Sequence, residues 1–176
     1  MPITKDETRY KVNLDKELDG LSDSFKAEAS EIAGQAVLDK LKEYVGKQQS
    51  PVSGQGKYKA LSSDYKKFKR KTVGNGKANL SLFGDLLESI DVDADIDGFE
   101  LVIDDPTEVL KSYNHNKGDT IPKRQFIPED TQKFKRDIIK SYEKKLQEFK
   151  KNRIPEKVNK SGLETLIPWE EIIGKD

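Results

Sequence analysis

The sequence predicts a small α+β protein in which long helices pack against a short antiparallel sheet. The helices are predicted by two stretches, one near each end of the chain, in which apolar residues recur at helical spacing. The sheet is predicted by apolar and acidic residues that alternate on both sides of Asp97-Gly98. Hydrophobic residues make up 34% of the chain and charged residues 36%. We therefore expect a thin core, and some apolar surface that needs a neighbouring subunit.

The first stretch predicts one long helix from about Leu14 to Val45. Its apolar residues follow one another in steps of three and four: Leu14, Leu18, Leu21, Phe25, Ala29, Ile32 and Ala36. Gly46 ends this helix, and Pro51 prevents its continuation. The helix would be about 48 Å long, whereas a compact domain of this size has a radius of gyration of about 16 Å. We expect part of the stripe to contact another chain, and residues 1–13 to form an N-terminal arm.

A basic segment predicts a second helix after a loop at residues 50–56. Residues 57–71 contain seven Lys or Arg and one acidic residue. Apolar residues recur through the segment at helical spacing, with Ser62 or Ser63 as the N-cap: Tyr58, Leu61, Tyr65 and Phe68. Because the aromatic side chains share this stripe, we expect them in the core rather than on a nucleic-acid-binding face.

An acidic hairpin is predicted after a short helix at about Gly84–Ser89. Residues 85–108 contain ten Asp or Glu and no Lys or Arg. Aspartates alternate with Ile90, Val92, Ala94 and Ile96 before Asp97-Gly98, and Phe99, Leu101 and Ile103 alternate after it. Asp-Gly between two alternating runs is a strong hairpin signal. One face should pack on the helices, while the acidic face contacts solvent.

The aspartates of this hairpin also match part of an EF-hand calcium loop. Asp93, Asp95, Asp97 and Gly98 have the expected spacing, but Asp104 stands where a bidentate Glu is usual. The segment after Gly98 resembles a strand and not the second helix of an EF-hand. We therefore favour an acidic hairpin over a calcium site.

The last third of the chain predicts two more helices and an arm. A short helix is expected at residues 106–114, followed by a loop with His115-Asn116 and an extended stretch from Ile121 to Pro128. A long helix should open at Pro128, with one apolar stripe: Phe134, Ile138, Tyr142, Leu146 and Phe149. We expect residues 14–152 to form a single α+β domain.

Residues 153–176 are expected to form a linker that ends in a docking arm. The arm is apolar and holds the only tryptophan: Leu166, Ile167, Pro168, Trp169, Ile172 and Ile173. It either folds back on its own domain or docks in a groove on a neighbouring subunit.

Nothing in the sequence indicates an enzyme. His115 is the only histidine, there is no cysteine, and no G-x-S-x-G sequence is present. We expect no catalytic residue, metal or cofactor. No apolar run near Met1 indicates a signal peptide or membrane span, so synthesis in the cytoplasm is expected. The net charge is zero but the charges lie in blocks of one sign, an arrangement that suits head-to-tail self-association.

Several fragments, taken in order, resemble one known family. They are Pro51-Val52-x-Gly54, Tyr58-Lys59-x-Leu61-Ser62-x-x-Tyr65-x-x-x-Lys69, Ala78-Asn79-Leu80, Gly84-Asp85-Leu86-Leu87-x-Ser89-Ile90, His115-Asn116 and Ile121-Pro122-x-Arg124-x-Phe126-Ile127-Pro128. We call residues 79–90 the first motif and residues 115–128 the second motif. This order is similar to that of the virion-morphogenesis, or tail-completion and neck, proteins of tailed bacteriophages. The resemblance covers about residues 51–149.

The resemblance implies a structural virion protein that forms a ring between the head connector and the tail. Its partners would be copies of itself and the neighbouring connector and tail proteins, with DNA passing through the lumen without specific binding. It also implies structural or subunit-interface roles for Gly84, Leu86, Leu87, His115, Asn116, Pro122, Arg124, Phe126 and Pro128. We expect Arg124 to bind carboxylates or carbonyls and Phe126 to lie in the core. The alternative is a small nucleic-acid-binding or regulatory module that uses the basic helices.

Overall fold

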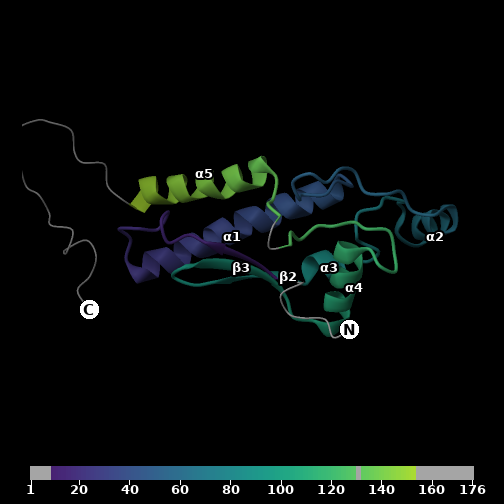
Figure 1. Ribbon diagram of the computed structural model, residues 1–176, viewed down its shortest axis with the longest axis horizontal. Helices are drawn as coiled ribbons and strands as arrows, with labels where there is room; N and C mark the ends of the chain where they lie inside the picture. The colour runs from purple at the N-terminus through teal and green to yellow at the C-terminus, as the bar shows by residue number, and fades with distance from the viewer. Residues whose placement is uncertain (1–8, 130–131, 154–176) are drawn as a thin grey trace, which may run out of the picture.

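The computed structural model describes residues 9–129 and 132–153 and shows an α+β fold. Its elements, in chain order, are β1 (Tyr10–Asn13), α1 (Asp23–Gly46), α2 (Ser63–Val73), α3 (Asp85–Glu88), β2 (Ile90–Ala94), β3 (Gly98–Ile103), α4 (Pro106–Lys117) and α5 (Arg136–Arg153). The strands form one antiparallel sheet in the order β1-β3-β2. Figure 1 shows α5 and α1 side by side along the long axis, with the strands along the other side of α1.

The predicted hairpin is confirmed, and its register separates the two faces of the sheet. Opposite Leu101 lie Tyr10 on one side and Val92 on the other, so apolar side chains share one face. Glu100 lies opposite Lys11 and Asp93 on the other face. The Glu100 carboxylate lies 3.3 Å from the Arg9 guanidinium and 3.7 Å from the Lys11 ammonium. The outer face therefore carries acidic side chains, and Arg9 and Lys11 neutralise only part of their charge.

The strand β1 corrects two predictions about the start of the chain. Residues 10–13 belong to the sheet and not to an arm, and the first helix begins at Asp23 and not at Leu14. The backbone N–H of Leu14 donates to Asp97 O at 2.8 Å, which continues the pairing with the hairpin. Gly20 has a φ of 80°, which a right-handed helix cannot accommodate. Leu14 and Leu18 are buried all the same, because the turns between β1 and α1 direct them into the core.

The helix α1 is covered largely by its own chain, and the predicted contact of part of its stripe with another chain stays a prediction. It packs against β2 and β3 on one side and against α5 on the other. Ala33, Leu41 and Val45 are fully buried between them. The helix approaches the sheet closely at Gly34, where a Cβ atom would lie 2.3 Å from Val92 Cγ1. The sheet and α5 therefore cover most of the apolar stripe of α1.

The helix α5 runs antiparallel to α1 and begins later than predicted. Phe25 near the start of α1 contacts Phe149 near the end of α5, and Tyr44 OH donates to the Asp137 carboxylate at 2.5 Å. The predicted stripe is confirmed where its burial is described: Phe134, Ile138, Leu146 and Phe149 are buried, and Tyr142 is partly buried. The helix cannot open at Pro128, since residues 133–135 pair with residues 51–53, including Lys135 N–H to Pro51 O at 2.7 Å.

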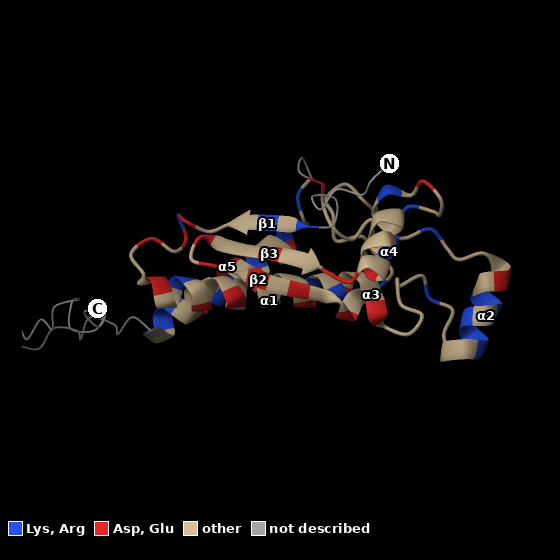
Figure 2. Ribbon diagram, turned by 90° about the horizontal axis from the view of Figure 1, so that it is seen from below, with Lys and Arg blue, Asp and Glu red and all other residues tan. Residues whose placement is uncertain are grey.

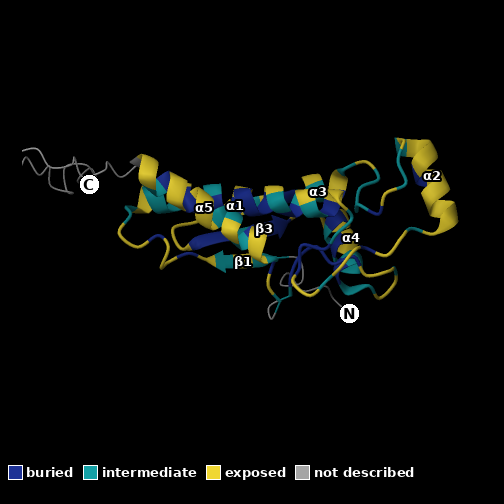
Figure 3. Cartoon of the chain, turned by 90° about the horizontal axis from the view of Figure 1, so that it is seen from above, coloured by how far each residue is buried: buried dark blue, intermediate teal, exposed yellow. Residues whose placement is uncertain are grey.

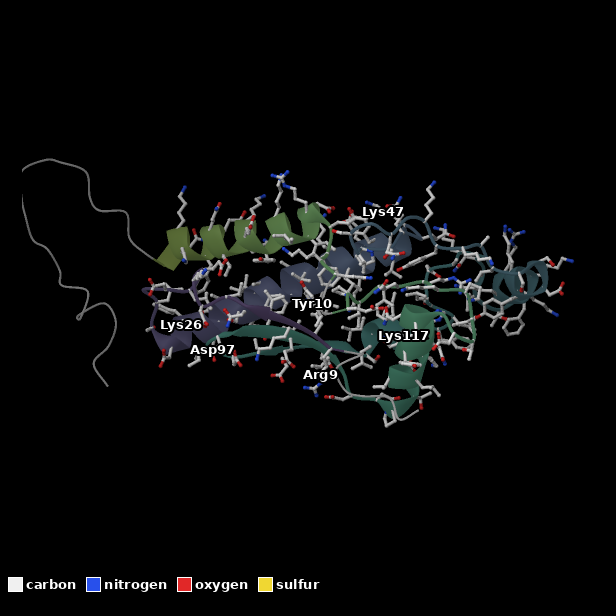
Figure 4. The ribbon with its side chains drawn as sticks, viewed as in Figure 1. Arg9, Tyr10, Lys26, Lys47, Asp97 and Lys117 are labelled. Atoms are coloured by element: carbon white, nitrogen blue, oxygen red, sulfur yellow. The ribbon has the colours of Figure 1, made fainter. Side chains whose placement is uncertain are left out.

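The molecule is elongated, and its two ends differ. We call the sheet, α1 and α5 the body, and we call α2, α3, α4, residues 74–84 and residues 121–128 the motif end. The helix α2 lies at one extreme of the long axis and the last turn of α5 at the other (Figure 1). Figure 3 shows that α2 is mostly exposed, whereas α1 is mostly covered. Asp97 at the tip of the hairpin and Lys117 at the end of α4 lie at separate positions along this axis (Figure 4).

Candidate functional site: a basic pocket at the motif end

The second motif is built around the C-terminal end of α4. His115 and Asn116 lie in the last turn of this helix, not in a loop as predicted. Gly118 ends the helix with a φ of 79°, and its N–H donates to Asn114 O at 3.0 Å. A Cβ atom on Gly118 would lie 2.8 Å from Lys123 Cα. Glycine is therefore required both for the turn and for the close return of the chain.

Asn116 joins this helix end to the returning segment. Its side-chain oxygen accepts hydrogen bonds from the backbone N–H groups of Phe126, at 2.9 Å, and Ile127, at 3.0 Å. Its amide nitrogen donates to Ser112 Oγ at 3.1 Å. Asn116 is 4% exposed, so without it two buried donors would lack a partner. The spacing between His115-Asn116 and Phe126 thus reflects a specific hydrogen-bonded connection.

Arg124 and Gln125 connect the same segment to the loop before α2. The Arg124 backbone N–H donates to His115 O at 2.8 Å, and its guanidinium donates to Lys59 O at 3.3 Å and Pro122 O at 3.4 Å. Ser50 Oγ donates to Gln125 O at 2.6 Å. The expectation that Arg124 binds carbonyl groups is confirmed for these contacts, and both groups belong to its own chain.

A pocket of about 340 Å³ lies between these segments. Residues from α2, from residues 77–86, from α4 and from the returning segment line it. The pocket brings together Leu86 from the first motif and His115 and Arg124 from the second. Apolar side chains at its wall include Leu61, Tyr65, Leu82 and Phe83. It therefore offers both apolar surface and nitrogen donors.

Lys69 is a buried cation at this pocket, although it lies on the exposed helix α2. The residue is 2% exposed, and its ammonium donates to Lys77 O at 2.7 Å and to Asn79 Oδ1 at 2.6 Å. Burial, and then the charge of Arg124, lower its pKa. Within the described residues, no acidic side chain forms an ion pair with Lys69 or Arg124. The pocket thus holds positive charge that carbonyl and amide groups solvate but no carboxylate neutralises.

His115 contributes a polar atom with no partner. Its Nδ1 is buried and forms no hydrogen bond within the described part of the chain. Burial, and then the neighbouring charge of Arg124, lower its pKa from 6.5 to about 4. His115 is therefore neutral near pH 7.

The chain is strained where it forms one wall of the pocket. Leu80 has a φ of 56°, a left-handed conformation that costs a non-glycine residue roughly 1–3 kcal/mol. Nearby, the side chain of Gln48 accepts a hydrogen bond from Ala78 N–H at 2.9 Å. The wall is held in place by specific contacts rather than by regular secondary structure.

The remaining predicted site residues do not line this pocket. Gly84 caps α3 with a φ of 107°, Leu87 is partly buried, and Pro122 is exposed. Phe126 is fully buried, as expected, and Pro128 is buried too. The arm residues lie outside the described residues: Leu166, Ile167, Pro168, Trp169, Ile172 and Ile173.

The burial of side chains on α2 differs from the prediction. Its N-cap is Ser62, one of the two residues predicted for this position, and Ser62 Oγ accepts a hydrogen bond from Tyr65 N–H. However, Tyr65 and Phe68 are 42% and 51% exposed, so the prediction that they are core residues is wrong. The helix buries Lys69 instead. No local signal separates Lys69 from the other bases of this segment, because its burial depends on residues 77–79 folding against it.

The hairpin shows no arrangement suited to calcium. Asp95 Oδ1 accepts hydrogen bonds from the N–H groups of Asp97, at 2.8 Å, and Gly98, at 2.9 Å, which is a turn contact. Among the residues that the structure describes, no cluster of three or more acidic, histidine or cysteine side chains is placed to hold a metal ion.

The comparisons with known proteins identify no relative of this chain. No protein-family model, curated protein or solved structure matches this chain significantly. None of the helices within residues 9–129 and 132–153 combines the length and hydrophobicity needed to cross a membrane.

Proposed function

We propose that this protein is a structural, non-enzymatic component of a tailed-phage virion, a ring-forming neck or tail-completion protein that joins the head connector to the tail. The observation that supports this most is the convergence of the two motifs behind the resemblance. Residues 79–83, 85 and 86 of the first motif line one pocket at one end of the molecule, together with His115 and Arg124 of the second motif, which lie far away in sequence. A shared local architecture gives a physical reason for the order and spacing of these fragments.

The distribution of charge and exposed apolar groups supports an assembling subunit. Basic residues gather on α2 and acidic residues on β2 and α3 (Figure 2). Among the described residues, the exposed large hydrophobic side chains lie mostly at the motif end: Tyr65, Phe68, Phe83 and Leu110. Opposite charges and unpaired apolar groups at separate places suit contacts between unlike surfaces of identical subunits, which close into rings.

The direct test is localisation in particles. Antibodies raised against the chain should label the junction of head and tail in purified virions viewed by electron microscopy. Particles made without the protein should accumulate as separate heads and tails. Labelling that is absent from particles, or normal joining without the protein, would refute the proposal.

The second candidate, nucleic-acid binding, is favoured by the exposed face of α2. Lys66, Lys67, Arg70 and Lys71 lie together on this helix, and the exposed rings of Tyr65 and Phe68 lie 6.0 Å apart. Cations with exposed aromatic rings are a typical single-strand-binding surface. Retention of DNA with a steep salt dependence, lost in Lys67→Glu with Arg70→Glu, would favour this candidate.

A further inference from the structure

We infer that the pocket at the motif end binds the C-terminal arm, residues 166–173, of a second copy of this chain. The inference deepens the proposed function by naming the contact that links neighbouring subunits. It rests on the proposed function only for the closure of such contacts into a ring.

The pocket and the arm have complementary chemistry. The pocket presents Lys69, Lys77, Lys111 and Arg124 among apolar side chains, with Asp85 as its one acidic lining residue. In the arm, Glu170 and Glu171 lie directly between Trp169 and Ile172-Ile173. Lys111 is paired with Glu108, whereas Lys69 and Arg124 form no ion pair within the described residues. An aromatic anchor next to carboxylates fits a pocket with an apolar wall and two such cations.

The most exposed apolar group of this region lies at the pocket. Phe83 is 67% exposed, although it precedes a helix whose Leu86 is buried. The described residues provide no cover for this ring. An arm with a tryptophan and two isoleucines supplies such cover.

The position of the arm favours a second copy over its own chain. The arm follows α5, whose last turn lies at the opposite extreme of the long axis from α2 (Figure 1). To reach its own pocket, the chain would have to run back along α1, which has 24 residues and is about 36 Å long, and then continue beyond it. Residues 154–168 span at most about 54 Å when fully extended, so they would have to be almost fully extended to follow this path. Docking on the next copy in a head-to-tail row needs no such reversal.

Trp169 makes the contact measurable in the full-length protein. It is the only tryptophan, and an indole that moves from water to an apolar pocket emits at shorter wavelength. We expect the emission of the purified chain to shift to shorter wavelength as protein concentration rises, together with an increase in mass by light scattering. An emission maximum that is independent of concentration, whether exposed or buried, would overturn the inference.

Pocket variants test the location. Phe83→Ser should weaken the concentration-dependent shift about tenfold or more, whereas Ile96→Ser should leave it unchanged. Ile96 is a matched control because it is 44% exposed and lies in the hairpin turn, outside the pocket. Equal effects of the two variants would overturn the assignment of the pocket.

A charge exchange tests the partners directly. Lys77→Glu should weaken association, and so should Glu170→Lys with Glu171→Lys; chains that carry all three changes should recover part of it. Lys71→Glu makes the same charge change on α2 outside this pocket and should have little effect. Absence of recovery would contradict a direct contact between Lys77 and the arm.

Because the chain has no cysteine, crosslinking separates the two possible occupants. A Phe83→Cys chain mixed with a Trp169→Cys chain should give a disulfide-linked heterodimer, whereas an Ile96→Cys chain in the same mixture should not. A chain with both Phe83→Cys and Trp169→Cys that closes on itself at every dilution would show binding to its own pocket and overturn the inference. Oligomers that form without the arm contradict this inference alone. Arm-dependent oligomers that are absent from virions contradict the proposed function alone.

Discussion

The body and the motif end of this molecule are stabilised in different ways. In the body, α1 lies between the sheet and α5, and its buried residues other than Ser30 and Gly34 are all apolar. In the motif end, the buried side chains include many polar ones: Lys69, Glu108, Ser112, Asn116, Arg124 and Gln125. Hydrophobic burial is non-directional, whereas hydrogen bonds to buried backbone groups require specific partners. The body thus tolerates conservative changes of its core, while the motif end depends on individual residues.

The two regions also differ in how much exposed apolar surface they leave for association. The apolar stripe of α1 is covered within the chain, but Phe83 and the aromatic rings of α2 are not. Surface available for a partner is therefore concentrated at the motif end. The predictions below test this division, beginning with the largest expected effect.

Phe99→Ala should cause the largest loss of stability. Phe99 is 1% exposed, lies in the central strand β3 and stacks edge-on against Tyr142 of α5, with ring centroids 6.4 Å apart. Truncation of a buried Phe lowers the free energy of unfolding by about 3–5 kcal/mol. Chemical denaturation measures it. A loss below about 1 kcal/mol would show that the sheet is not part of the folded core.

Asn116→Ala should lower the free energy of unfolding by about 2–3 kcal/mol, because it leaves the N–H groups of Phe126 and Ile127 buried without acceptors. Asn114→Ala is the matched control, because it makes the same change at a half-buried asparagine of the same helix. If the two variants prove equally destabilising, the role of the Asn116 side-chain oxygen is not as described.

His115 should make the motif end sensitive to acid. The pKa of His115 is lowered to about 4 in the folded protein, against 6.5 in the unfolded chain. Between these values the unfolded state binds more protons, so stability is fully present above about pH 6.5 and is lost as pH falls towards 4. The loss should be about 1–3 kcal/mol. The charged groups that line the pocket with His115 are Lys69, Lys77, Lys111, Arg124 and Asp85, and of these it is Arg124 whose charge lowers the pKa of His115.

The measurement is thermal unfolding between pH 7.5 and pH 4 for the protein and for His115→Gln. The carboxylates titrate alike in both, so the difference in slope belongs to the histidine. Parallel pH profiles for the two proteins would contradict burial of a neutral imidazole.

Phe83→Ala should have the smallest effect on stability, within about 0.5 kcal/mol, because the ring is exposed. It makes the same chemical change as Phe99→Ala at a site that differs in burial. Circular dichroism and denaturation should match those of the unchanged protein, while self-association weakens. A loss of stability comparable with that of Phe99→Ala would mean that this ring is buried within its own chain.

Local patterns predicted much of the body and less of the motif end. The Asp97-Gly98 hairpin, the end of α1 at Gly46 and the buried stripe of α5 follow from signals within a few residues of each other. The strand β1 was missed because its four residues are a strand only by pairing with β3, far along the chain. The exposure of Tyr65 and Phe68 was missed for a related reason, since an apolar stripe shows that a helix has an apolar face but not that another element covers it.

The sequence by itself determined where the hairpin turns, which helices carry apolar faces and that the hairpin has one acidic face, because these properties depend on neighbouring residues and on the periodicity of the backbone. Only the tertiary structure decided which apolar faces are covered, where α5 begins, and that Lys69, His115 and Arg124 share one pocket. Burial and pairing depend on segments that are distant in the chain, and their outcome is set by packing of the whole molecule rather than by local preference.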